Sequence, residues 1–68
     1  MSLYFADQSW PKLESAISRS TLIILPVGTI EEHGQHLPVS TDVVIATEVA
    51  RRIGERLKEE IPLLVMPP

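Results

Sequence analysis

The longest apolar run of the chain, in Thr21–Val27, constrains its fold more than any other feature. Runs of this length without alternating polar residues are typical of strands that are covered on both faces, as in parallel sheets. Pro26 cannot donate to a strand ladder, so we expect the strand to end near it. The run therefore predicts a buried strand in an α/β fold.

A short helix is predicted upstream of this strand. Ser9 is a candidate N-cap, and Pro11 is tolerated in a first helical turn. Apolar residues then recur at i, i+3 and i+4, at Leu13, Ala16 and Ile17. The pattern predicts an amphipathic helix of about three turns.

A longer helix is predicted downstream, with Thr41 as its candidate N-cap and Pro62 at its end. Apolar residues at helical spacing define one buried stripe on it: Ala46, Val49, Ala50, Ile53 and Leu57. The opposite face carries charges of both signs, with Glu48 and Arg52 at the favourable i, i+4 separation. Such a mixed face indicates solvated surface rather than a binding patch.

Leu63–Met66 is a second apolar run of strand length, so the predicted order is strand, loop, helix, strand. A crossover of this kind makes a right-handed βαβ unit with parallel strands. Two strands and one helix cannot cover both faces of a sheet, and 68 residues bury little surface. We therefore expect further polypeptide, either the rest of a longer parent chain or a companion chain, to pack against this unit.

The composition excludes several classes of protein. The chain has no cysteine, so neither disulfides nor thiolate metal sites can support it. Its net charge of -3 gives no general attraction to nucleic acid or anionic lipid. The N-terminus lacks a basic leader, and no apolar run approaches the roughly 20 residues of a membrane span, so a cytoplasmic location is expected.

The loop of residues 28–40 follows the carboxyl end of the first strand, where ligands bind in open parallel sheets. The loop and the adjoining helix start bring together five ionisable side chains: Glu31, Glu32, His33, His36 and Asp42. No Lys or Arg occurs between Ser20 and Ala50 to balance the carboxylates. Oxygen and imidazole ligands without sulfur suit zinc, manganese or iron(II).

Spacing favours some of these side chains over others as ligands. Glu31 and His33 leave an extended backbone on the same side, whereas Glu32 points away. Asp42 lies near a helix start, where the macrodipole favours a carboxylate. A rival interpretation is that Asp42 only complements the helix dipole and that the other groups are ordinary loop surface. Glu-x-His alone is too weak a motif to decide between the two.

A longer motif favours the metal site. The segment PVGTIEEHGQHLPVSTD, from Pro26 to Asp42, is similar to the signature of the creatininase (creatinine amidohydrolase) family, P-x-G-S-x-E-Q-H-G-P-H-L-P followed by T-D. Trp10-Pro11 also resembles the family's opening, and Val65–Pro68 resembles its second strand. The resemblance implies that residues 1–68 form the N-terminal βαβ part of a single, incomplete domain with a three-layer α/β/α fold and a mostly parallel sheet.

The resemblance also implies roles for individual residues. Glu31 would bind one metal ion, His33 the neighbouring ion, and Asp42 would bridge the two. His36 matches the histidine of the family's H-L-P segment, for which we expect a supporting catalytic role rather than direct ligation. Gly28 and Gly34 are expected to serve tight turns. Thr29, Glu32 and Gln35 depart from the common Ser, Gln and Pro of the signature, and a carboxylate at Glu32 could compete for an ion.

The implied activity is hydrolysis of an amide-type C–N bond, cyclic or in a formamide, by an enzyme with two divalent metal ions. The implied partners are a small-molecule amide, the remainder of the domain and further copies in a homo-oligomer. The ligands that complete the family's site would lie downstream, so the 68 residues alone are not expected to be active. The alternative is a noncatalytic structural or interaction fragment of a creatininase-like protein.

Overall fold

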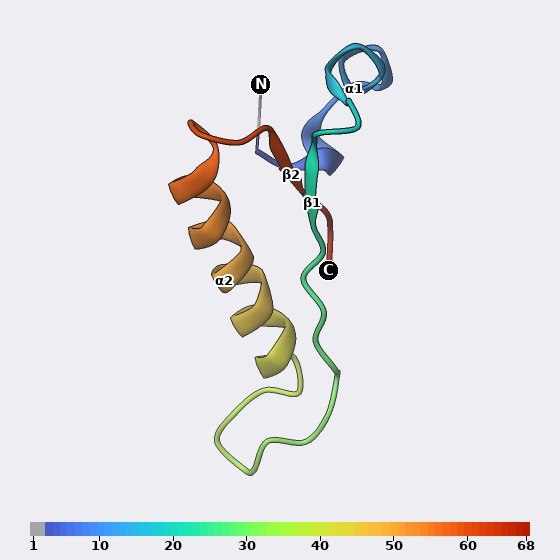
Figure 1. The fold of residues 1–68 in the computed structure, drawn as a ribbon. Coiled ribbons are helices and arrows are strands. Elements are labelled where there is room, and N and C mark those ends of the chain that lie inside the picture. The colour runs from blue at the N-terminus through green and yellow to red at the C-terminus, as the bar shows by residue number, and fades with distance from the viewer. Residues whose placement is uncertain (1–2) are drawn as a thin grey trace.

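A computed structural model describes residues 3–68 and contains two strands, two α-helices and one short 3-10 helix. In chain order these are η1 (Phe5–Asp7), α1 (Trp10–Ala16), β1 (Leu22–Ile24), α2 (Thr41–Leu57) and β2 (Leu63–Val65). A long loop joins β1 to α2, and α2 lies beside the small sheet (Figure 1). The predicted order of strand, loop, helix and strand is confirmed.

The two strands pair in parallel, as the crossover connection predicts. Leu22 is opposite Leu63, and Ile24 is opposite Val65. On the other side of β2, Val65 also forms a parallel bridge with Tyr4. β2 is therefore flanked on both sides, while β1 is the outer strand among the described residues. The chain has the α/β class that its sequence predicts.

The burial of the two strands differs because of this order. All of β2 is buried, and Leu64 is fully inaccessible. In β1, by contrast, Leu22 is 43% exposed and Ile23 is 46% exposed. Residues 3–68 do not themselves cover β1, so a first strand that is covered on both faces stays a prediction for the chain together with further polypeptide. Both strands are also shorter than predicted, since ladder pairing ends at Ile24 and Val65.

Helix α2 packs mainly against β2, through a stripe of small residues. Ala50 and Gly54 are buried there, and a Cβ on Gly54 would lie 2.9 Å from Leu3 Cδ1. The predicted stripe was only partly right, because Val49 and Ile53 remain 50% and 42% exposed. The smallest side chains face the sheet because they allow the helix to approach it closely.

The ends of the helices also differ from the predictions. Ser40, not Thr41, occupies the N-cap position of α2, and the Thr41 hydroxyl donates instead to the Pro38 carbonyl. α2 ends at Leu57, well before Pro62, in a turn where the Ile61 amide donates to the Leu57 carbonyl.

Helix α1 has 7 residues, about two turns rather than three. Ser9 is at its N-cap position without a side-chain capping bond, Ile17 is its C-cap, and Leu13 is buried.

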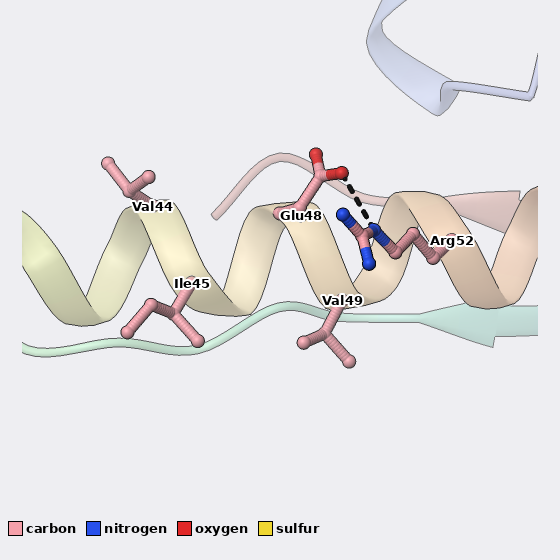
Figure 2. Close-up of a pocket in the computed structure, with 5 residues that line it drawn as sticks. All are labelled: Val44, Ile45, Glu48, Val49 and Arg52. Atoms are coloured by element: carbon pink, nitrogen blue, oxygen red, sulfur yellow. Dashed lines mark hydrogen bonds and ion pairs between the residues drawn. The ribbon is translucent and has the colours of Figure 1, made fainter.

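The outer face of α2 carries both apolar and charged side chains. Val44, Ile45, Glu48, Val49 and Arg52 line an open hollow of about 340 Å³, in which Ile45 and Val49 point to the same side of the helix (Figure 2). Glu48 accepts hydrogen bonds from Arg51 and, as predicted, from Arg52. These bonds lower the pKa of Glu48 to about 2.

None of the described helices is long and apolar enough to cross a membrane.

Candidate metal centre

The loop between β1 and α2 is closed by its own backbone. The Glu31 amide donates to the Val39 carbonyl at 3.1 Å, which joins the two arms of the loop. At its tip, Gly34 has a φ of +83°, a value that favours glycine, so its predicted role in a turn is confirmed. The Glu32 carboxylate accepts a hydrogen bond from the Gly34 amide. The loop thus holds residues 31–33 in a defined position beside the start of α2.

Gly28 brings the first arm of the loop against the helix. A Cβ at this position would lie 2.6 Å from the Val43 nitrogen and 2.7 Å from the Asp42 carbonyl carbon. The backbone forms neither a turn nor a bend at Gly28, so the turn expected there is wrong, and the reason for glycine is the close approach to α2. This contact holds the loop against the first turn of α2, where Asp42 lies.

Three of the predicted ligands converge at this junction. Glu31, His33 and Asp42 each offer a ligand atom, and these atoms lie within 4.8 Å of one another. His33 Nε2 is 3.4 Å from Asp42 Oδ1 and 3.6 Å from Glu31 Oε1. Nε2 is inaccessible to solvent and has no hydrogen-bond partner among residues 3–68. A buried polar atom without a hydrogen-bond partner costs free energy. A bound ion or ligand that contacts Nε2 would remove this cost.

The separations in this group suit a metal ion better than direct hydrogen bonds. An N–H···O bond spans about 2.7–3.2 Å, which is shorter than either distance from His33 Nε2. Two ligands of one tetrahedral ion, with bonds of about 2.1 Å, lie roughly 3.4 Å apart. One imidazole nitrogen and two carboxylates also form the donor set that suits zinc, manganese and iron(II). The residues present therefore fit a divalent ion.

Asp42 has a second partner that spacing alone did not indicate. Thr29 Oγ1 donates to Asp42 Oδ2 at 2.9 Å, while Oδ1 of the same carboxylate faces His33. The two residues lie on different arms of the junction, so no local sequence pattern links them. The sequence did contain a chemical signal for this contact. Thr29 stands where the creatininase signature has serine, and threonine and serine both carry a hydroxyl that can donate to a carboxylate.

The remaining two ionisable loop residues are not part of this group. Glu32 directs its carboxylate to the Gly34 amide, away from the other ligands, as its spacing predicted. His36 is exposed and lies near Gly34, where an added Cβ would be 3.7 Å from His36 Nδ1. Its supporting catalytic role stays a prediction, and so do the ligand roles of the three grouped residues.

The chain resembles known proteins over nearly its whole length. Residues 6–68 match the family model described as "Creatininase: Creatinine amidohydrolase". A creatinine amidohydrolase of Pseudomonas putida is 34% identical over 97% of this chain, which corresponds to 24% of that protein. A mycofactocin precursor peptide peptidase of Mycobacterium tuberculosis is 49% identical over 68% of the chain and 19% of that protein.

Two further similarities involve a more distant hydrolase and a solved structure. A 3-dehydro-scyllo-inosose hydrolase of Thermotoga maritima is 29% identical over 76% of the chain and 17% of that protein. A solved creatininase with one tryptophan replaced by alanine superposes with a TM-score of 0.82 at 32% identity, covering 98% of this chain and 25% of that one. The chain thus spans between 17% and 25% of the length of these relatives. The family match and these similarities show that the chain belongs to the creatininase family.

Proposed function

We propose that this chain contributes half of the binuclear metal site of an amidohydrolase, and that the complete protein hydrolyses an amide-type C–N bond. The observation that carries the proposal is the buried Nε2 of His33, which has no hydrogen-bond partner among residues 3–68 and lies 3.6 Å from Glu31 Oε1 and 3.4 Å from Asp42 Oδ1. The names of two relatives, an amidohydrolase and a peptidase, describe hydrolysis of such bonds. The substrate class is a cyclic amide or a formamide.

In this proposal, Glu31 would hold one divalent ion and His33 the other, and the Asp42 carboxylate would be shared by both. Ions bound there would supply Lewis-acid chemistry, polarising the substrate carbonyl and making water nucleophilic at neutral pH. Asp42 lies in the first turn of α2, where the positive end of the helix dipole attracts negatively charged side chains. The closed loop holds Glu31 and His33 in place by the bond between the Glu31 amide and the Val39 carbonyl.

The rest of the site and of the domain lies, in this proposal, outside the 68 residues. The bare outer surface of β1 and the length of the relatives support a larger single domain in which these residues are the N-terminal segment. The additional polypeptide would cover the exposed apolar side chains, supply the remaining ligands and form the substrate pocket. The isolated 68-residue chain is accordingly proposed to be inactive.

Metal analysis of the full-length protein tests the proposal. We expect two divalent transition-metal ions per chain, loss of at least one in His33→Ala, and loss of both in Asp42→Asn. Glu32→Gln is the matched control, because Glu32 neighbours the ligands but bonds to the Gly34 amide; it should retain both ions. Purified protein without stoichiometric transition metal would exclude a metal-dependent enzyme.

A noncatalytic interaction fragment is the second candidate. It is favoured by the exposed apolar side chains of β1 and α2, which provide a surface for a companion chain. Asp42→Asn separates the two functions. If the protein is an enzyme, this variant loses hydrolysis of amide substrates while its fold is retained. If the protein is an interaction module, the variant binds the companion chain as tightly as wild type does.

A further inference from the structure

We propose that Thr29 is a positioning residue for the metal centre, whose hydroxyl orients the Asp42 carboxylate for ion binding. The inference rests on the proposed function, because it concerns the same group of ligands. Thr29 is not itself a ligand in this proposal, and the two oxygens of Asp42 have different partners, Thr29 for Oδ2 and His33 for Oδ1.

The hydrogen bond from Thr29 restricts rotation of the Asp42 carboxylate. Thr29 Oγ1 donates to Oδ2 at 2.9 Å, which lies within the range of roughly 2.5–3.0 Å for an O–H···O hydrogen bond. Oδ1 is then left facing His33 Nε2 at 3.4 Å. Without the hydroxyl, rotation about the terminal torsion of the aspartate, which is broad, would no longer be restrained. The bond therefore selects the orientation in which Oδ1 and Nε2 can share an ion.

The backbone positions the hydroxyl. Gly28 lies directly against the peptide that joins Asp42 to Val43, where a side chain would collide at 2.6–2.8 Å. The next residue, Thr29, is thereby held at the start of α2, within reach of the carboxylate. Gly28 and Thr29 thus act together. The glycine allows the loop to approach α2 closely, and this approach brings the Thr29 hydroxyl within hydrogen-bond distance of Asp42.

A neutral hydroxyl suits this task better than a charged donor. It leaves the negative charge of Asp42 intact for cations, and no Lys or Arg occurs between Ser20 and Ala50 to compete for it. Each carboxylate oxygen has about two acceptor positions, so Oδ2 can accept from Thr29 and still bind an ion. Thr29 is exposed, so its hydroxyl is not required to satisfy a buried group. Its contribution to folding is accordingly small, and its main effect is on metal binding.

Metal affinity of Thr29 variants of the full-length protein tests the proposal. Zn²⁺ affinity is measured by competition with a chromophoric chelator for wild type, Thr29→Val, Thr29→Ala and Thr29→Ser. Loss of a group that orients a ligand typically weakens metal binding by 10–100-fold, which is expected for valine and alanine. Serine retains the hydroxyl and should bind within about threefold of wild type. The alanine and serine variants differ only by the hydroxyl oxygen. Comparing their zinc affinities therefore tests the role of the hydroxyl even if the Thr29→Val protein does not fold.

Two further measurements separate orientation from folding. The absorption spectrum of bound Co²⁺, which reports ligand geometry, should change in Thr29→Ala and not in Thr29→Ser. The unfolding free energy of the metal-free variants should differ by at most about 1 kcal/mol, the contribution of one ordinary hydrogen bond. If wild type binds zinc and Thr29→Ala binds it equally well, the positioning role is wrong and the metal site stands. If wild type binds no zinc, both proposals are wrong.

Discussion

His33 and Asp42 face each other without a hydrogen bond, since Nε2 lies 3.4 Å from Oδ1 and has no hydrogen-bond partner among residues 3–68. Leaving a desolvated nitrogen unpaired costs roughly 1–3 kcal/mol. Other contacts hold the loop in place despite this loss of free energy, namely the bond from the Glu31 amide to the Val39 carbonyl and the packing of Gly28 against α2. An ion placed between the two side chains would satisfy both at once, which links metal binding to stability.

Removing metal from the full-length protein should therefore lower its stability. At a free Zn²⁺ concentration about 100 times the dissociation constant, binding stabilises the folded state by about 2.7 kcal/mol. Denaturant unfolding with and without a chelator measures this difference. His33→Ala should lose most of the response to zinc, and its metal-free form should be at least as stable as metal-free wild type because the unpaired nitrogen is gone. A zinc response in His33→Ala as large as in wild type would contradict the assignment.

Gly28→Ala should destabilise the junction between the loop and α2. The added Cβ would meet backbone atoms of Asp42 and Val43 at 2.6–2.8 Å, and backbone cannot move aside as the end of a flexible side chain can. Overpacking of this kind costs about 1–3 kcal/mol. Urea unfolding should show this loss, and metal affinity should fall with it because the loop moves relative to Asp42.

Gly34→Ala is the control for this change. Its Cβ would meet only His36, in ordinary contact at 3.7 Å, so its cost comes from the φ of +83° and should be roughly 1–2 kcal/mol. Because this Cβ would not contact the Asp42–Val43 peptide, the Gly34 substitution should affect metal affinity less than Gly28→Ala does. Equal losses of affinity in the two variants would argue against a specific role for the close approach at Gly28.

The sequence predicted the topology and the grouping of ligands because both depend on strong local signals. Continuous apolar runs and a helical period define the βαβ order. The connection between the strands makes them parallel. The spacing of Glu31 and His33, together with Asp42 at a helix start, brought these three residues into one hypothesis, and the structure groups the same three.

What the sequence did not predict depends on contacts between distant segments. The bond from Thr29 to Asp42 and the close approach of Gly28 join two arms that the loop brings together only in the folded chain. Helical period alone did not distinguish Val49 from Ala50, because the sheet selects the side of α2 that carries Ala50 and Gly54. Strand ends were overestimated because apolar character continues beyond the last paired residue.

Glu48 should make a pH-dependent contribution to stability. Hydrogen bonds from Arg51 and Arg52 lower its pKa from 4.5 to about 2, so the folded state holds the ionised form more strongly than the unfolded chain does. The contribution is fully present above pH 4.5 and is lost as the pH falls through 2. The effect should be small, because the group is exposed and salt screens it.

Glu48→Gln measures this effect in the full-length protein. The difference in melting temperature between wild type and Glu48→Gln should be largest near neutral pH, shrink between pH 4.5 and 2, and decrease with added salt. Glu14→Gln is the control, since Glu14 is exposed on α1 and forms no ion pair among residues 3–68. A difference for Glu48→Gln that does not change with pH would mean that the arginine bonds do not persist in solution.

Ile23 and Leu64 are paired across the sheet, yet Leu64 is fully buried and Ile23 is 46% exposed in the 68-residue structure. Leu64→Ala should cost about 2–5 kcal/mol, the usual range for a buried leucine. If the rest of the domain covers β1, as proposed, Ile23→Ala in the full-length protein should cost a similar amount. Without such a cover, roughly half of the Ile23 side chain stays in water and its truncation costs about half as much. Urea unfolding of the two variants, with Leu25→Ala as a comparison at a position 62% exposed in this chain, therefore tests whether the parent domain adds a layer over β1.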